Sequence, residues 1–241
     1  MGFTIGSSRG IRDIRSGSRR RGRTAECTVV AEYTGLWGWT VVPGARATDG
    51  VCSCGAPDCT APGAHPLAHA AEIPAGATLD EVSRAWSRVP GATLLLPVGR
   101  TFDVLDVAAP AGRRALVRLE RMGLPLGPVS MTPDGRCQFF VAPGAAGDLP
   151  ELLYRMGWDD ADLDLHCLGP GDHITAPPSD RGGLGRVSWL RPPTLDMADT
   201  AYGTDVTDGE ESTGTLVTST APPEARLLLG TLAYICHRST I

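Results

Sequence analysis

The chain has 241 residues, of which 42% are hydrophobic and 20% are charged, and its formal net charge is −5. No apolar run approaches the roughly 18 residues that a membrane-spanning helix needs, and the first 25 residues lack the apolar core of a signal peptide. These features exclude a membrane protein and favour a cytoplasmic globular domain with many turns. All 22 basic residues are arginines, so a phosphate-binding lysine is excluded. With 30 glycines and 20 prolines, this usage indicates a bacterial source with a GC-rich genome.

Residues 1–24 form a basic arm that we expect to be disordered. Within residues 1–23, seven arginines stand against a single acid, Asp13. Such an arm could contact the phosphates of a nucleic acid. The alternative is a solvated arm that aids solubility or docks on the acidic remainder of the chain.

Residues 25–193 read as one domain in which helices and strands alternate without an internal repeat. Thr78 and Glu81 have the spacing of a capping box at the start of a helix, and Pro133-Asp134-Gly135 joins two apolar strands as a hairpin. The mixture of helices, strands and hairpins predicts the α+β class. Helices are expected over 24–39, 78–86, 112–122 and 149–156, and strands over 39–43, 92–97, 101–107, 129–132, 137–141, 162–165, 173–176 and 187–190.

The last 48 residues divide into a loop and a helix. Residues 194–222 contain little that can pack and are expected to form a flexible acidic loop. Residues 223–241 open on Pro223-Glu224 and predict a helix that packs back on the domain through its leucines. The acids of the loop include Asp205, Asp208, Glu210 and Glu211.

A cysteine-rich loop spans residues 44–66. It places three thiols and an imidazole within 14 residues, and this ligand set suits a structural zinc ion. The alternative is free thiols in a surface loop. A catalytic zinc is disfavoured, because no neighbouring glutamate offers a general base. The four groups are those of Cys52, Cys54, Cys59 and His65. We interpret three scattered cysteines, Cys27, Cys167 and Cys236, as small packing residues.

Three segments in a fixed order carry the strongest functional signal. They are 102–108 (Phe-Asp-Val-Leu-Asp-Val-Ala), 132–140 (Thr-Pro-Asp-Gly-Arg-Cys-Gln-Phe-Phe), and 163–165 (Leu-Asp-Leu) running on to 176–179 (Ala-Pro-Pro-Ser). Each places an apolar strand beside a carboxylate or a tight polar turn. A sheet face that holds divalent cations and a triphosphate is built in this way.

In order and spacing these segments resemble the N-terminal domain of bifunctional DNA primase/polymerases, the prim-pol branch of the archaeo-eukaryotic primases. The resemblance covers about residues 27–193 and the last helix. It implies an RRM-like sheet, mixed or antiparallel, and a small α/β unit around an open cleft. It also implies template-directed nucleotide polymerisation with Mg²⁺ or Mn²⁺, and so a role in DNA replication. Nucleotide and DNA would be its ligands, and a helicase or another replication partner would act in trans, because the chain contains no helicase domain.

The resemblance assigns roles to individual residues. Asp106 and Asp164 match the first and third acids of the family and would be the divalent-metal ligands of an active enzyme. Ala108 stands where the second acid is expected. Asp103 cannot replace that acid in a regular strand, because residues three apart project from opposite faces.

The turn at 132–136 resembles the segment that leads to the family's nucleotide-binding histidine. Cys137 or Gln138 occupies the place of that histidine, and Arg136 could supply a charged contact to phosphate. These three residues would therefore form the nucleotide-binding set. The alternative for Arg136 is an exposed arginine of the turn. His166 and His173 flank Asp164. A single histidine is more often a structural residue than a catalytic one, so we expect a structural role for both.

Two functional hypotheses follow from these substitutions. The first is a primase/polymerase-type nucleotidyltransferase with weak or altered activity. The second, on the same fold, is a non-catalytic module that binds a nucleotide, a nucleic acid or a protein. Each 1.36 kcal/mol of barrier is a factor of ten in rate, and losing one ligand of a two-metal centre would cost several kcal/mol. A degenerate catalytic site is therefore favoured over a working polymerase.

Overall fold

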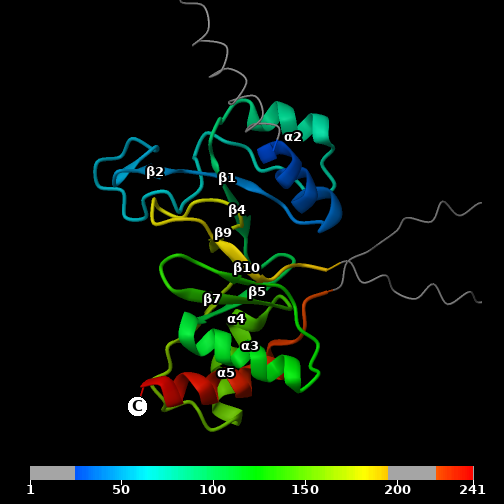
Figure 1. Cartoon of the computed structure of the whole chain (residues 1–241), viewed down its shortest axis with the longest axis vertical. Coiled ribbons are helices and arrows are strands. Elements are labelled where there is room, and N and C mark those ends of the chain that lie inside the picture. The colour runs from blue at the N-terminus through cyan, green and yellow to red at the C-terminus, as the bar shows by residue number, and fades with distance from the viewer. Residues whose placement is uncertain (1–24, 195–220, 241) are drawn as a thin grey trace, which may run out of the picture.

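The computed structural model describes residues 25–194 and 221–240. In these ranges the strands form three antiparallel sheets, accompanied by helices, which confirms the α+β class. Figure 1 shows two lobes stacked along the long axis of the molecule. The basic arm at 1–24 and most of the acidic loop expected over 194–222 lie outside the described residues.

The first lobe is built on a small sheet with the strand order β1-β4-β9. A helical segment over 25–31 continues into η1 (Glu32–Leu36), and together with α2 (Leu79–Trp86) it packs on this sheet around buried residues that include Tyr33, Val82 and Trp86. The cysteine-rich loop leaves this lobe as a short hairpin. The strands are β1 (Val42–Gly44), β4 (Thr93–Pro97) and β9 (His173–Thr175), and the hairpin consists of β2 (Ala47–Thr48) and β3 (Val51–Cys52).

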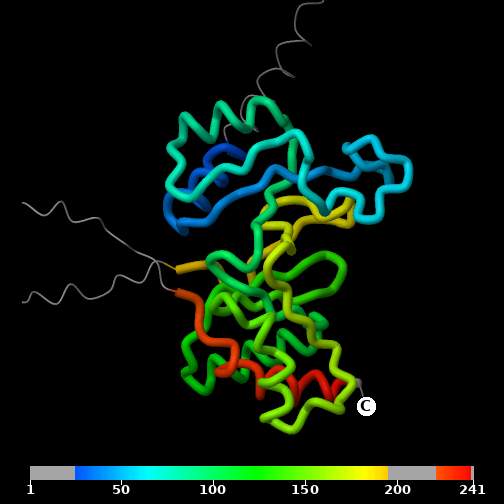
Figure 2. The backbone as a smooth tube through the Cα atoms, turned by 180° about the vertical axis from the view of Figure 1, so that it is seen from behind, coloured from blue at the N-terminus to red at the C-terminus, as the bar shows by residue number. Residues whose placement is uncertain are grey.

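The second lobe is a five-stranded antiparallel sheet with the order β10-β6-β7-β5-β8. Three helices cover one face of it, and α3 and α5 lie side by side there (Figures 1 and 2). The strands are β5 (Asp103–Ala108), β6 (Val129–Met131), β7 (Arg136–Val141), β8 (Leu165–Leu168) and β10 (Ser188–Arg191), and the helices are α3 (Ala109–Arg121), α4 (Ala145–Arg155) and α5 (Ala225–Thr240).

Local signals account for several of these elements. The predicted capping box of α2 is confirmed, because the Glu81 amide donates to Thr78 Oγ1 at 3.3 Å and the Thr78 amide donates to Glu81 Oε2 at 2.8 Å. The hairpin of β6 and β7 is confirmed as well, with Gly135 in the left-handed region at φ 84°. Pro110 lies in the first turn of α3, where a missing N–H costs nothing.

Several predicted boundaries were wrong: the helix expected over 112–122 begins at Ala109, and the strand expected over 39–43 begins at Val42. The strand expected over 162–165 begins only at Leu165, and Asp164 precedes it. The helix expected over 149–156 begins at Ala145. Its start depends on a distant acceptor, because Asp103 Oδ2 accepts the amides of Gly144 at 3.0 Å and Ala146 at 2.9 Å.

The strand β5 separates two hydrophobic cores. Leu105 and Val107 point toward α3 and α5, whereas Val104 points toward the other lobe. On that second face, Phe140 packs with Trp39 and Trp189 at ring-centroid distances of 5.5 and 5.6 Å. The contact with Trp39 joins the two lobes, because Trp39 precedes β1, whereas Trp189 lies in β10 of the same sheet as Phe140.

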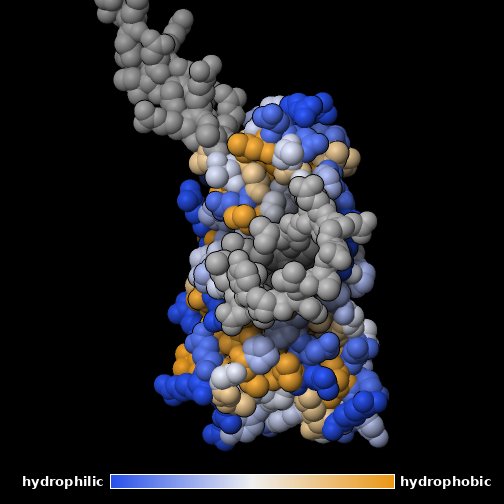
Figure 3. Space-filling view, turned by 90° about the vertical axis from the view of Figure 1, so that its right-hand side faces the viewer, coloured by the Kyte–Doolittle hydropathy of each residue, from blue (hydrophilic) through white to orange (hydrophobic). Residues whose placement is uncertain are grey.

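The described surface is mixed in character. Hydrophobic residues on the face seen in Figure 3 form small groups among hydrophilic ones. Among the described helices, none combines the length and the apolar character that crossing a membrane requires.

We expect Asp103→Ala to lower the free energy of unfolding by about 2–3 kcal/mol, because it removes a buried charged acceptor from two amides at the start of α4. Urea denaturation followed by circular dichroism would measure the change. Asp148→Ala is the matched control, since Asp148 is an exposed acid in the first turn of the same helix. It should cost less than about 1 kcal/mol. Equal losses in the two variants would contradict the capping role of Asp103.

Candidate functional site

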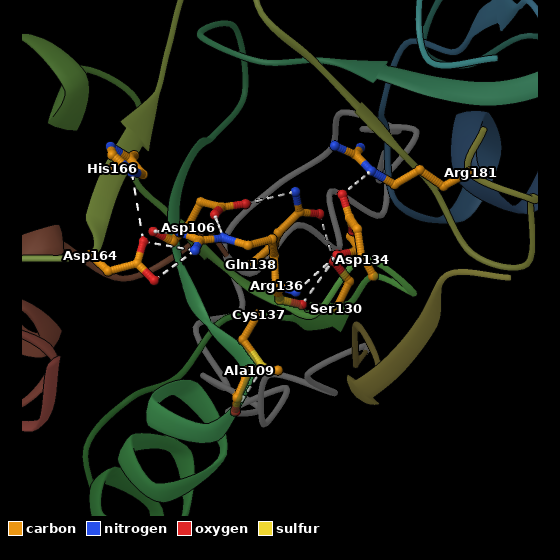
Figure 4. A network of polar contacts seen from close by, with 11 residues as sticks. Asp106, Ala109, Ser130, Asp134, Arg136, Cys137, Gln138, Asp164, His166 and Arg181 are labelled. Atoms are coloured by element: carbon orange, nitrogen blue, oxygen red, sulfur yellow. Dashed lines mark hydrogen bonds and ion pairs between the residues drawn. The ribbon is translucent and has the colours of Figure 1, made fainter. Parts of the chain in front are cut away.

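A row of polar side chains crosses the face of the five-stranded sheet that lies away from the three helices. The antiparallel register places Ser130 opposite Gln138, Gln138 opposite Asp106, and Asp106 opposite His166. Each of these residues comes from a different strand, in the order β6, β7, β5 and β8. Because residues directly opposite one another on antiparallel strands project from the same face, all four side chains lie on one face of the sheet (Figure 4).

Hydrogen bonds fix the buried half of this row. Ser130 Oγ donates to Gln138 Oε1 at 3.1 Å, and Gln138 Nε2 donates to Asp106 Oδ2 at 3.1 Å. Ser130 and Gln138 are 0% and 1% exposed, so these bonds satisfy groups that water cannot reach. The Asp106 carboxylate is thereby held in one orientation.

Arg136 joins the two aspartates that the sequence singles out. Its Nε donates to Asp106 Oδ1 at 2.5 Å, and its Nη1 donates to both oxygens of Asp164, at 2.7 and 2.8 Å. Its Nη2 also donates to the backbone carbonyl of Asp106 at 3.3 Å. One guanidinium therefore lies between both carboxylates (Figure 4). Arg136 belongs to β7 and only 24% of its side chain is exposed, so it is not an exposed arginine of the turn.

The charges of this cluster are only partly balanced. Burial alone would lower the pKa of Arg136, but its hydrogen bonds with Asp164 and Asp106 outweigh that effect and raise the pKa. The guanidinium is thus a permanent cation facing two carboxylates. His166 Nε2 lies 3.7 Å from Asp164 Oδ1, at the edge of this cluster.

A pocket of about 440 Å³ opens over the polar row. Asp106, Arg136 and His166 line it from the sheet, and His173 and Arg181 line it from the first lobe. Burial is the main cause that lowers the pKa of His173, so this imidazole is neutral at pH 7.

An ion pair closes one end of this pocket. Arg181 Nε donates to Asp134 Oδ2 at 3.0 Å and so connects the loop after β9 with the β6–β7 turn. Burial would raise the pKa of Asp134, but the hydroxyl of Thr132 and the guanidinium of Arg181 lower it, so Asp134 is ionised at neutral pH.

Cys137 does not belong to the pocket. It lies on the opposite face of the sheet with 0% exposure, where its Sγ is 3.7 Å from the carbonyl oxygen of Ala109 in α3. A Cβ on Gly112 would come within 2.4 Å of the Cys137 Cβ, so this contact requires glycine. Burial raises the pKa of Cys137 to about 11. Of the three residues expected to bind nucleotide, the structure places Arg136 and Gln138 together and Cys137 elsewhere.

Sequence reasoning missed several residues around the pocket. Of these residues, only Ser130 could have been predicted from the sequence, because a serine inside a buried apolar strand needs a hydrogen-bond partner. Asp172 and Arg181 line the pocket from loops, and Asp134 contacts it through Arg181. Their positions depend on the packing of the two lobes, which local patterns do not reveal.

The four groups of the cysteine-rich loop converge in the first lobe. The ligand atoms of Cys52, Cys54, Cys59 and His65 all lie within 4.8 Å of one another, so they could hold a metal ion such as zinc. Cys52 Sγ is 3.3 Å from His65 Nε2, and the Gly63 amide donates to the same sulfur at 3.5 Å.

Two further contacts suit these groups to a metal. Burial would raise the pKa of Cys52, but hydrogen bonds with the Cys54 and Gly63 backbone and with His65 lower it to about 6, which favours the thiolate that a metal binds. The other imidazole nitrogen, Nδ1, lies 2.9 Å from the Pro66 carbonyl oxygen, an arrangement common for a metal-binding histidine.

A family model described as the N-terminal domain of bifunctional DNA primase/polymerases matches residues 30–201. The chain belongs to this family. The match confirms the resemblance drawn from the three sequence segments and makes the chain a DNA primase/polymerase-like domain. It includes the polar row and the cysteine-rich loop, whereas α5 lies beyond it. No curated protein and no solved structure matches the chain.

We expect Arg136→Ala to lower the free energy of unfolding by about 1–3 kcal/mol, because it leaves two carboxylates without their shared counter-charge. Thermal and urea denaturation at low salt would measure the loss. Arg155→Ala is the control, since Arg155 forms an exposed pair with Glu151 worth less than about 1 kcal/mol. A variant as stable as the wild type would show that the bridge contributes nothing to folding.

Proposed function

We propose that this prim-pol domain binds a nucleotide or a nucleic-acid strand in its cleft without polymerising. The observation that carries the proposal is the single guanidinium of Arg136 bonded to both Asp106 and Asp164. In this proposal the five-stranded sheet corresponds to the RRM-like sheet of the family, and the first lobe corresponds to its small α/β unit.

The geometry around Asp106 does not fit a pair of divalent cations. Such a centre needs two or three carboxylates converging on cations about 3.5–4 Å apart. Ala108, in the place of one acid, has no ligand oxygen on its side chain, and the antiparallel register sets Arg136 directly opposite it. A divalent cation between Asp106 and Asp164 would have to displace the guanidinium and be repelled by it. The arginine therefore supplies the positive charge that metals would otherwise supply.

The remaining chemistry of the pocket suits recognition. Arg136 and Arg181 are already paired with carboxylates of the chain, so neither is free to neutralise a triphosphate. His166 and His173 are the imidazoles that remain toward the pocket, since Gln138 is 1% exposed and already bonded to Ser130 and Asp106. Such donors and acceptors suit the edges of a base or a sugar hydroxyl better than a metal–triphosphate. Metal-dependent nucleotidyl transfer is the alternative that the same experiment tests.

The decisive experiment combines synthesis and metal binding. We expect the wild type to extend a primer, or to prime de novo, no better than Asp106→Ala and Asp164→Ala with either Mg²⁺ or Mn²⁺. We expect the double variant Ala108→Asp/Arg136→Ala to gain Mn²⁺ binding in electron paramagnetic resonance titrations, because it restores a carboxylate and removes the competing cation.

Its control is the triple variant that also carries Asp106→Asn, which should lose this gain. Synthesis by the wild type that disappears in both single aspartate variants would overturn the proposal and establish that two acids suffice.

We also propose that the cysteine-rich loop holds one structural zinc ion. The support is the convergence of three thiols and one imidazole on a loop whose own strands are only two residues long. Such a loop gains most of its stability from a metal.

Protein expressed with zinc should contain about one equivalent by elemental analysis, and Cys59→Ser and His65→Ala should lose it. Cys167→Ser is the control, because Cys167 lies in β8 of the other lobe and should leave the zinc content unchanged. A chelator should lower the melting temperature of the wild type but not that of Cys59→Ser. Zinc content that is zero in the wild type, or equal in all variants, would exclude the site.

A further inference from the structure

The helices α3 and α5 form an outer surface on the side of the sheet away from the polar row. They run antiparallel, since Arg114 of α3 contacts Ser239 at one end and Arg118 contacts Tyr234 further along. Arg114 Nη2 donates to Ser239 Oγ at 2.5 Å, and the Arg118 guanidinium lies 5.6 Å from the centre of the Tyr234 ring. Both contacts lie on the exposed seam between the helices. We call this surface, made by Arg114, Arg118, Arg121, Tyr234 and Arg238, the back-face patch.

The charge of these helices is opposite to that of the chain. Whereas the whole chain has a formal charge of −5, α3 and α5 contain six exposed arginines and a single acid, Glu120. Glu120 already faces Arg191 at 3.8 Å. Among the described residues, no carboxylate comes within ion-pair distance of any of these six arginines, which are Arg113, Arg114, Arg118, Arg121, Arg226 and Arg238.

The spacing of the arginines forms a continuous row. Arg114, Arg118 and Arg121 are separated by four and three residues, so they share one face of α3. At 1.5 Å per residue the row is about 10 Å long, so its guanidiniums can contact successive phosphates of one strand. Arg238 adds a further cation from α5, beside Ser239.

Exposed apolar groups lie among these cations. Tyr234 is 43% exposed, and Val117 and Met122 of the α3 region are 47% and 54% exposed. An aromatic ring flanked by arginines is the combination that holds a strand whose bases are unpaired, because bases stack on the ring while phosphates meet the guanidiniums. A protein segment with acidic side chains would match only the charge.

We propose that the back-face patch binds single-stranded nucleic acid, independently of the cleft. Arg114, Arg118 and Arg121 hold phosphates, and Tyr234 with its apolar neighbours packs against bases. This binding requires neither the Asp106–Arg136–Asp164 cluster nor a metal.

The test is fluorescence anisotropy of a labelled 20-nucleotide oligo(dT) with the full chain, titrated over a range of salt concentrations. We expect the triple variant Arg114→Gln/Arg118→Gln/Arg121→Gln to bind about tenfold or more weakly at low salt. We expect its log–log salt slope to be shallower by about two, from three lost phosphate contacts on a single strand. Tyr234→Leu should weaken binding to the single strand more than binding to a duplex of the same length.

Two charge-matched controls come from the same chain. Arg19→Gln/Arg20→Gln/Arg21→Gln removes three charges from the basic arm, and Arg84→Gln/Arg88→Gln/Arg155→Gln removes three exposed charges from the described surface. Each should retain more affinity than the back-face variant. Circular dichroism and melting temperatures must show that all three variants are folded.

Several outcomes would overturn the proposal. They are undetectable binding by the wild type, a back-face variant that binds as the wild type does, and a loss confined to the arm variant. Binding to anionic vesicles without binding to the oligonucleotide would assign the patch to membranes instead. Oligonucleotide binding that appears only when Asp205, Asp208, Glu210 and Glu211 are neutralised would assign the patch to the chain's own acidic segment. The back-face variant leaves the Asp106–Arg136–Asp164 cluster intact. Its loss of oligonucleotide binding is therefore distinct from a failure of the proposed cleft function, which the primer-extension and Mn²⁺ measurements test.

Discussion

The alternation of side chains along β5 is the constraint on which the rest of the structure depends. This strand is covered on both faces, so a shift of one residue would exchange the partners of every side chain. Leu105 and Val107 pack under α3 and α5, and Val104 packs toward the aromatic contact that joins the lobes. Once these apolar positions are fixed, Asp103 must cap α4 and Asp106 must face the cleft. Packing therefore separates a carboxylate that caps a helix from one that lines the pocket only three residues away.

The same constraint places two carboxylates near one another, and Arg136 stabilises them. The sheet brings Asp106 and Asp164 close to one another, and ionised carboxylates at such a separation repel. A guanidinium can bond two carboxylates at once, because its donors form a planar fork that stays charged at any physiological pH. A lysine would offer one compact charge instead, and the chain contains none. Unlike a bound metal, this cation is covalently part of the chain and cannot leave the cleft.

Local patterns predicted much of the fold but little of the site. The capping box of α2, the β6–β7 hairpin and the opposite orientation of Asp103 and Asp106 each follow from residues within a few positions of one another. The start of α4 does not, since its acceptor, Asp103, lies 41 residues before Gly144 in the chain. Arg136 likewise meets Asp164 only because β5 lies between β7 and β8. Sequence could assign a strand to each residue, but the pairing of the strands decides which side chains meet.

The two faces of the second lobe therefore differ in how their charges are satisfied. On the cleft face, the guanidinium of Arg136 is already paired with Asp106 and Asp164, so it offers a polyanion little attraction there. On the helical face the arginines of α3 and α5 are without carboxylate partners among the described residues. At about 0.1 M salt, charges more than about 10 Å apart are largely screened, so a ligand responds to the local surface and not to the net charge of −5. An acidic protein can thus present a surface that attracts phosphates, provided that its acids lie elsewhere or are already paired.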